Sequence, residues 1–508
     1  EKMFPNLFPY GIGGYLSSTF LSGNNIGFAN YIKTRLLSTN SKFRDDPMYI
    51  FFLLLVKEMV QTQYSKQTFF RQATKVPNLN AKSIDDTTKE FLMRNNSAFN
   101  VLKGIRGTAP YFEAAKKKLM AFIRQKGPPT LFCTFSSAEF DWNELVLQIY
   151  QTKKRQKFSI EFIEKQSSAW KNKVISENVV QSTMHFAKRT DKLISHLSKV
   201  PVFEHDGVKY TVESFFYRYV DSLYLFHSFP SIFRVEFQAR GAPHLHCMFW
   251  LEGENGELPP RLFSEDDVDS NASRIAHFAK SCISGSFKDV LCSSCSSSSS
   301  SLCKECNDLK ELVQHYQTHS HRTTCLKRSK VVRIKSNEGH GKLDGVKEED
   351  ELQLKTCRFD FPKNPLDETL FLPSLPLDTD PKVLKMLKTD YSKIRKYLLR
   401  MTSCENFRDE EKWKNFKDFS FFDFLEEVGM FELGEDVSKR EFQEKAKARN
   451  LEALRCEARS GGILILRRDT CNIMTNNFNK NLIQSHEANQ DIQFITNEYA
   501  VAEYLSKY

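Results

Sequence analysis

The sequence predicts an α+β fold: an antiparallel central sheet with flanking helices, a helical N-terminal region and a cysteine-rich insertion. A β-rich run at residues 130–136 has the length of a central strand. Runs at residues 233–238 and 244–251 flank five turn-forming residues, which predicts a hairpin. Apolar residues at helical spacing in residues 49–60 and 111–123 predict helices near the N-terminus.

Composition bounds the class of protein without identifying it. The chain has 508 residues, enough for about three structural units, and 40% of them are hydrophobic, which excludes wholesale disorder. The net charge of +10 permits an anionic partner but names none. The longest apolar run, residues 49–56, is far shorter than the roughly 20 residues of a membrane span. No signal segment opens the chain, so neither a membrane nor an exported protein is predicted.

Four regions are predicted: a helical region at residues 1–125, a sheet core at 126–280, a Cys- and Ser-rich insertion at 281–362, and a C-terminal part at 363–508. Within them, residues 153–227 read as helical and basic, as do residues 382–400. Residues 461–466 predict a turn and strand, and residues 497–508 a terminal helix. The insertion, with its serine run and an acidic patch, is expected to form solvated loops without a packed core.

Two histidines in the hairpin are the strongest candidates for chemistry. His244 and His246 alternate along a strand, so both imidazoles face the same way. Folding about residues 239–243 brings Glu236 beside His246 and Gln238 beside His244. Two imidazoles and an oxygen ligand leave open positions on a divalent metal; the oxygen favours Mg²⁺ or Mn²⁺, although imidazole also accepts Zn²⁺. Ordinary strand alternation remains the other interpretation of such a pair.

The C-terminal helix offers a nucleophile. Tyr504 and Tyr508 are four residues apart and share one helical face. Core packing explains most such pairs. A phenol becomes an effective nucleophile when its target is polarised, which the histidine-bound cation would supply.

These features together resemble a HUH-type Rep endonuclease. The shared features are PHLH, a Glu eight residues before its first His, the strand LFCTFS and the Tyr-x-x-x-Tyr helix. More narrowly, the chain resembles the N-terminal and Rep nuclease region of Helitron rolling-circle transposases. Further similar segments, in order, are FPNLFPYGIGG, LKGIRGTAPYF, TLFCTFSSAEFDWNEL, VEFQARGAPHLHCMFWL, CRFDFP, NNFNK and DIQF.

The resemblance implies a Rep-type sheet and a metal-dependent single-stranded DNA endonuclease and strand transferase of rolling-circle DNA transposition. His244 and His246 would hold Mg²⁺ or Mn²⁺, with Glu236 as third ligand and Gln238 as runner-up. Tyr504 and Tyr508 would be nucleophiles that form a 5′-phosphotyrosine and free a 3′-OH. It also implies a nuclear protein whose partners are transposon ends and target DNA. Contacts to that DNA are expected from Lys507, Arg240 and Arg234, with Lys507 orienting the scissile phosphate.

The chain also departs from the family. Full Helitron proteins continue into a helicase, whereas this sequence contains no G-x-x-x-x-G-K-[ST], so ATPase activity is not predicted for it. It begins at Glu1 and stops at Tyr508, and we expect it to be a piece of a longer protein with a truncated tyrosine helix. Two alternatives therefore stay open: a catalytically inactive DNA-binding remnant of a transposon, and a zinc-stapled interaction protein.

Cysteine spacing in the insertion predicts structural zinc. Two C-x₂-C pairs could form one tetrahedral site, and an H-x-H-x₃-C segment with a later cysteine could form another. The family resemblance favours the second set. Free thiols and disulfides are the alternatives. The candidate ligands are Cys292, Cys295, Cys303 and Cys306 in the first set, and His319, His321, Cys325 and Cys357 in the second.

Overall fold

The predicted α+β class is confirmed by the computed structural model. It describes residues 1–15, 26–74, 103, 108–218, 235–237, 243–260, 268–297, 302–326, 331–334, 352–376, 378–402, 410–429, 438–458 and 462–507. In the segments 65–74, 217–218, 235–237, 268–270, 323–324, 331–334, 352–355, 410–413 and 506–507, and at residue 297, only the backbone is described.

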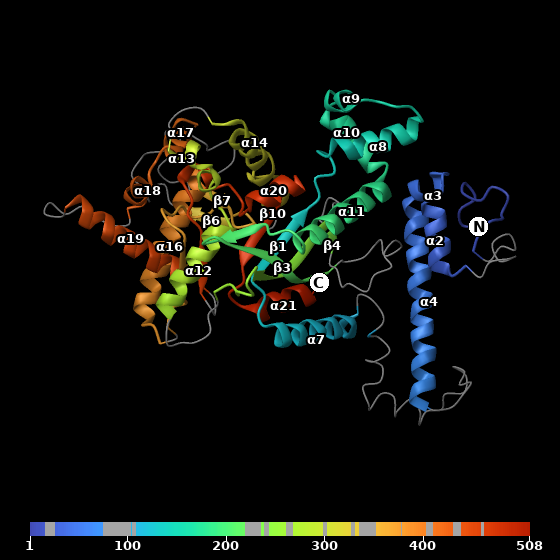
Figure 1. Cartoon of the computed structure of the whole chain (residues 1–508), viewed down its shortest axis with the longest axis horizontal. Helices are drawn as coiled ribbons and strands as arrows, with labels where there is room; N and C mark the ends of the chain where they lie inside the picture. Colours follow the sequence, from blue (N-terminus) through green and yellow to red (C-terminus); the bar gives the residue numbers. More distant parts are fainter. Residues whose placement is uncertain are drawn as a thin grey trace.

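An antiparallel sheet lies at the centre of the molecule (Figure 1). Its strand order is β10-β1-β5-β3-β2. β3 pairs with the later part of β5 and β4 with its first three residues, so β4 extends the line of β3 along the same edge. The strands are β1 (Leu131–Ser136), β2 (Phe203–His205), β3 (Val208–Arg218), β4 (Val235–Phe237), β5 (Pro243–Gly253) and β10 (Gln490–Phe494).

One face of this sheet carries the main hydrophobic core. Cys133, Phe135, Cys247 and Phe249 alternate to this face and are fully buried. Burying a side chain the size of Phe stabilises the fold by about 1.5–3 kcal/mol. The helices that contribute to this core are α8 (Asn143–Lys154), α9 (Ile160–Glu164), α10 (Ser168–Ser176), α11 (Val179–Leu197), α12 (Val268–Cys282) and α20 (Lys480–His486).

Two helices from opposite ends of the sequence cover the other face. α7 (Ala109–Lys126) and α21 (Glu498–Lys507) lie together beneath the sheet (Figure 1). Leu119 of α7 and Leu505 of α21 pack with Met248 and Trp250 of β5. The Trp250 indole also donates a hydrogen bond of 2.8 Å to the Gly127 carbonyl. The predicted terminal helix is therefore confirmed, and it lies against the His244/His246 face of β5.

The helical prediction for residues 153–227 is wrong at its C-terminal end. The chain is helical to Leu197, but β2 and β3 then form a hairpin. Asp206 and Gly207 connect them with φ of 49° and 79°, the two positive values that a tight two-residue hairpin turn requires. The Asp-Gly pair between alternating residues was the overlooked signal.

The insertion contains a packed core, contrary to prediction. Leu309 of α14 (Lys304–Leu312) and Val313 of the π-helical turn (Val313–Gln317) are buried against Phe478 and Ile483. The alternation of apolar residues with charges in KECNDLKELV gives this helix one apolar face, which α20 covers. The other elements here are α13 (Ser293–Ser297), α15 (Thr323–Leu326), β6 (Val331–Ile334) and β7 (Leu352–Lys355). The acidic patch at 348–351 lies outside the described residues.

A second hydrophobic cluster holds the C-terminal helices together. Phe416, Phe424 and Ile394 are buried in it. Asp390, which is 2% exposed, accepts two hydrogen bonds from the Arg449 guanidinium, at 2.7 and 2.9 Å. The elements are α16 (Pro381–Thr402), α17 (Glu410–Lys417), α18 (Phe421–Val428) and α19 (Lys439–Arg455), beside β8 (Leu370–Leu372) and β9 (Ile463–Ile465). The predicted basic helix and the predicted strand at 461–466 are thus confirmed as α16 and β9.

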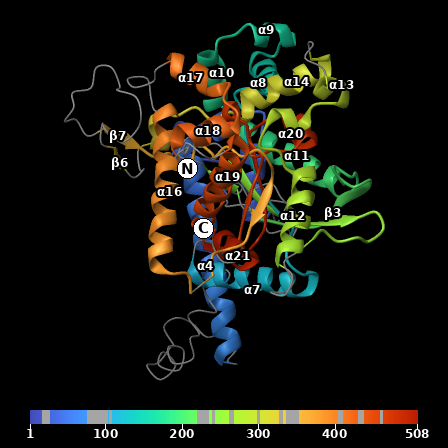
Figure 2. The same cartoon turned by 90° about the vertical axis from the view of Figure 1, so that its left-hand side faces the viewer.

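The N-terminal helices have an aromatic core of their own. Phe8, Tyr31, Phe43 and Tyr49 are buried in it. These helices are α2 (Phe28–Leu36), α3 (Lys42–Asp45) and the long α4 (Pro47–Thr74), which projects beyond the rest in both views (Figures 1 and 2). Among the helices of the described chain, none is both long and apolar enough to cross a membrane. The boundaries of the four predicted regions stay a prediction.

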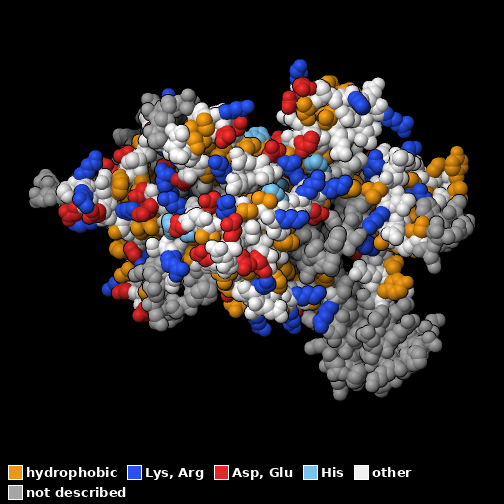
Figure 3. Space-filling model, in the orientation of Figure 1, with side chains coloured by type: hydrophobic (Ala, Val, Ile, Leu, Met, Phe, Trp, Pro, Cys, Tyr) orange, Lys and Arg blue, Asp and Glu red, His pale blue; other side chains and the backbone are white. Residues whose placement is uncertain are grey.

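Charge is mixed over the surface. Figure 3 shows Lys and Arg side chains interspersed with Asp and Glu on the visible face. The modest excess of +10 therefore does not point to a single binding face, and local geometry must locate any anion site.

Candidate active site and zinc sites

His244 and His246 lie side by side on the face of β5 that α21 covers. Their ring centroids are 4.7 Å apart and the rings are nearly perpendicular. His246 is only 5% exposed, whereas His244 is partly buried. Strand alternation places both imidazoles on this face, as predicted.

Hydroxyl groups of the neighbouring strand orient both rings. Thr134 pairs with His246 and Ser136 with His244 across β1 and β5. The Thr134 Oγ1 lies 3.2 Å from Nδ1 of His246, and the Ser136 Oγ lies 3.0 Å from Nδ1 of His244. Histidine ligands commonly hydrogen-bond through the nitrogen that does not bind the metal. Nε2 is therefore the atom through which each ring would bind a cation.

Tyr504 lies directly against this histidine pair. Its ring centroid is 5.6 Å from that of His246 and 6.0 Å from that of Phe132, edge-on in both cases. Burial of Ala502 and Leu505 fixes the helix on the sheet. Tyr504 itself is 41% exposed, so a ligand can approach it from solvent. Folding thus brings together two residue types that are far apart in the sequence.

The structure does not describe the side chains of five other predicted site residues. Lys507 is the last residue of α21, but only its backbone is described, and Tyr508 lies outside the described residues. Gln238, Arg234 and Arg240 lie outside them too. The roles assigned to these five residues stay predictions.

Glu236 lies opposite His244, not His246 as the sequence interpretation had it. Pro243 begins β5 and pairs with Phe237, so the five-residue loop starts and ends one residue earlier than predicted. Proline is acceptable at the first residue of a strand, where its missing N–H costs no ladder hydrogen bond. The partner of Glu236 is therefore displaced by two residues along β5, from His246 to His244. Because side chains alternate with a period of two, the backbone position of Glu236 still belongs to the sheet face that carries the histidines.

The histidine face also carries Asp491, a carboxylate that the sequence interpretation did not consider. It pairs with Thr134 across β10 and β1, so it belongs to the histidine face. Gln493 donates a hydrogen bond of 2.8 Å to its carboxylate. Burial raises the pKa of Asp491, against the opposing influence of nearby Lys363 and other positive groups. Its segment, DIQF, alternates like a strand and could have suggested a carboxylate on the sheet.

The four-cysteine set is assembled at the start of α13 and α14. The sulfur atoms of Cys292, Cys295, Cys303 and Cys306 all lie within 4.8 Å of one another. Backbone N–H groups of Cys303 and Cys292 donate to the sulfurs of Cys295 and Cys306, at 3.3 and 3.5 Å. Hydrogen bonds, first from the Cys295 backbone, lower the pKa of the Cys292 thiol to about 7. Four converging thiols suit a structural Zn²⁺ ion.

The second predicted set also converges. The ligand atoms of His319, His321, Cys325 and Cys357 lie within 4.8 Å of one another. The His319 ring stacks on Phe361 with centroids 4.5 Å apart. Burial lowers the pKa of His319 to about 4, so its imidazole is neutral at physiological pH, the form that binds metal. Both sets could therefore hold structural zinc, as their spacing predicted.

The fold and these sites define an α+β protein with cysteine-rich groups able to bind metal. Residues 31–249 match the family described as the Helitron helicase-like domain at the N-terminus. The matched segment includes β1 and most of β5 with both histidines. The match supports a Helitron-related protein with a transposon-related, transposase-type function. No curated protein and no solved structure matches the chain.

Proposed function

We propose that the protein is a metal-dependent enzyme that nicks and joins single-stranded DNA through a tyrosine, in rolling-circle transposition. The observation that carries this proposal is the edge-on contact of Tyr504 with His246, 5.6 Å between ring centroids. The transposon-related family match supports DNA as the substrate, and we propose a nuclear location on the same ground.

The donor set fits a divalent cation. His244 and His246 would bind Mg²⁺ or Mn²⁺ through Nε2, and Glu236 would be the third ligand, since its backbone position faces His244. A bound divalent ion supplies Lewis-acid polarisation of the phosphodiester. Thr134 and Ser136 would keep the two rings oriented for that ion.

Tyr504 would carry out the covalent step. Its phenolic oxygen attacks the phosphorus atom and the P–O bond to the 3′ oxygen breaks, leaving a 5′-phosphotyrosine and a 3′-OH. The phenol loses one proton and the departing 3′ oxygen gains one. The phosphodiester energy is retained in the tyrosine ester, so a 3′-OH rejoins the strand without ATP. Tyr508 would make a second nick or strand transfer.

A covalent-adduct assay tests the proposal. The full chain is incubated with Mn²⁺ and single-stranded oligonucleotides, and adducts stable to denaturant are digested and mapped by mass spectrometry. We expect DNA on Tyr504, loss of that adduct in Tyr504→Phe, and no change in Tyr499→Phe. Tyr499 is the matched control because it is exposed on the same helix.

The outcomes separate the alternatives. DNA binding without an adduct would contradict the enzyme and favour an inactive DNA-binding remnant. If the protein contained zinc but neither bound DNA nor formed an adduct, the zinc-stapled interaction protein would be favoured, which the two four-ligand sets also support. An adduct that persists when both Tyr504 and Tyr508 are replaced by Phe would overturn the tyrosine mechanism.

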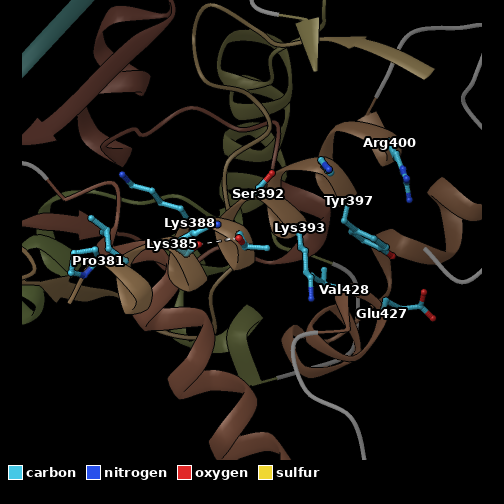
Figure 4. Close-up of a pocket in the computed structure, with 12 residues that line it drawn as sticks. Pro381, Lys385, Lys388, Ser392, Lys393, Tyr397, Arg400, Glu427 and Val428 are labelled. Atoms are coloured by element: carbon cyan, nitrogen blue, oxygen red, sulfur yellow. Dashed lines mark hydrogen bonds between the residues drawn. The ribbon is translucent and has the colours of Figure 1, made fainter. Parts of the chain in front are cut away.

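A basic groove along α16 would hold the DNA backbone. It encloses about 770 Å³, and Glu427 is the only acidic residue among its described lining residues. Figure 4 shows Lys385, Lys388 and Lys393 along α16, with Val428 and Glu427 of α18 beside Lys393. From Lys385 to Arg400 the helix extends about 22 Å, long enough for several phosphates. The basic lining residues are Lys385, Lys388, Lys393, Lys396 and Arg400.

Neutralising part of this groove is expected to weaken DNA binding without removing the adduct at saturating DNA. Replacing Lys385, Lys388 and Lys393 with Gln should reduce the slope of log affinity against log salt by about 2, at roughly 0.7 per phosphate of single-stranded DNA. Fluorescence anisotropy over a salt series measures it. A control variant makes the same charge change on exposed α19, at Lys439, Arg440 and Lys445. Equal slopes in both variants would exclude the groove.

A further inference from the structure

A third group of metal-type ligands lies at the far edge of the sheet, outside both zinc sets. His205 ends β2, Asp206 follows it in the turn, and His277 comes from α12. Their ligand atoms lie within 4.8 Å of one another. The Asp206 Oδ2 is 3.4 Å from Nε2 of His205 and 3.5 Å from Nδ1 of His277. Three donors from two separate elements therefore point to one place.

The local backbone is shaped so that Asp206 reaches both rings. Its φ is 49°, in the left-handed region that few side chains favour, although Asp tolerates it better than most. The β2–β3 turn requires this conformation, because two residues with positive φ join the strands. The turn also directs the carboxylate toward α12 and His277.

His205 is held as metal-ligating histidines usually are. Its Nδ1 lies 3.0 Å from the Ser281 Oγ, which leaves Nε2 directed at Asp206. The ring packs edge-on against Phe278 and His277, with centroids 5.2 and 4.8 Å away. The orientation, and not only the proximity, of this donor is therefore fixed.

This group is separate from the candidate active site. His205 pairs with Val208, and Tyr210, two residues further along β3, pairs with Gly253, which lies seven residues after His246 on β5. At about 3.3 Å per residue, His205 is therefore roughly 30 Å from His246 along the strand direction. A ligand at His205 would therefore not touch a DNA phosphate held at His246.

We propose that His205, Asp206 and His277 form a binding site for a first-row transition-metal dication, Zn²⁺ being the expected ion, with water completing its coordination. Two imidazoles and one carboxylate favour such ions over Mg²⁺, which prefers oxygen ligands. Binding ties the β2–β3 turn to α12 across the edge of the sheet. The site stands on geometry alone and does not depend on DNA chemistry.

Metal counting on the full chain tests this site. Protein equilibrated with micromolar Zn²⁺ is expected to hold one equivalent that neither the two cysteine-containing sets nor the His244/His246 pair accounts for. Replacing zinc with Co²⁺ separates the classes, because thiolate ligands give intense charge-transfer absorption and an imidazole–carboxylate site gives only weak visible bands. We expect His277→Ala and Asp206→Asn each to weaken the extra site at least about 100-fold, since even outer-sphere changes cost 10–100-fold.

His196→Ala is the matched control, because His196 is an exposed histidine on α11 that belongs to none of the ligand groups among the described residues. Both test positions are largely exposed, at 60% for His277 and 64% for Asp206, so their variants should fold. Retention of the extra equivalent in both variants would overturn the proposal. Equal loss in His196→Ala would mean an adventitious ion only. Absence of an extra equivalent in the unmodified chain would also refute it.

Discussion

Replacing His246 with alanine is expected to reduce the rate of tyrosine–DNA adduct formation at least about 100-fold. The variant removes one of the two imidazoles that would hold the cation. Loss of a group that merely hydrogen-bonds to a metal ligand already reduces metal affinity or activity 10–100-fold. His244→Ala should have a similar effect, because both rings belong to one donor set 4.7 Å apart. Single-turnover adduct formation with Mn²⁺, followed on denaturing gels, measures the rate.

Thr134→Val distinguishes a positioning role from ligation. It removes the hydroxyl 3.2 Å from Nδ1 of His246 but keeps the imidazole and nearly the same volume. We expect this variant to need about 10-fold more Mn²⁺ for half-maximal adduct formation, and its rate to recover at saturating Mn²⁺. His246→Ala should not recover, and His196→Ala should match the unmodified protein. Full activity of folded His246→Ala, as judged by circular dichroism, would rule out a cation on this histidine pair.

Sequence periodicity predicts the local parts of this candidate site well. The pair His244 and His246 had to share a face, because strand alternation is a local rule. Tyr504 had to lie on a helix for a similar reason. What periodicity could not supply was the packing of that helix against β5, which depends on burial of Leu505 with Met248 and Trp250.

Long-range pairing accounts for the errors. The partner of Glu236 depends on where a loop closes, and the early start of β5 at Pro243 moved it by two residues. Asp491 went unnoticed because β10 is short and pairs with a strand more than 350 positions earlier in the chain. The core of the insertion was missed because Leu309 is buried against Phe478 and Ile483, which are more than 160 positions later in the chain.

The second zinc set should have structural effects that reach the sheet. His319 donates its backbone N–H to the Met474 carbonyl at 2.7 Å, and Lys363, just after Cys357, donates to that of Ile473 at 2.8 Å. The next residues continue to β10, where the Asn476 side chain donates to the Gln490 carbonyl at 3.0 Å. Loss of zinc from this set would therefore loosen the strand that carries Asp491.

Cys357→Ser is accordingly expected to remove one zinc ion per chain and to lower the free energy of unfolding by at least about 3 kcal/mol. Structural zinc contributes about 10–16 kcal/mol in small peptides, and a larger hydrophobic core retains part of that stability. Zinc analysis and denaturant unfolding measure the two effects. Cys456→Ser is the control, because Cys456 forms no disulfide and belongs to no ligand group in the part of the chain that the structure describes.

The two sets should differ in their consequences. Cys325 and Cys357 are 2% and 6% exposed, whereas Cys303 is exposed at the surface. Cys303→Ser should therefore release zinc with a smaller loss of stability and leave adduct formation unchanged. Cys357→Ser should also slow adduct formation, because its set is linked by backbone hydrogen bonds to the segment that precedes β10. If Cys303→Ser and Cys357→Ser reduced stability and adduct formation equally, the insertion would be stabilised as one unit. The proposed link from the second set to the sheet would then be wrong.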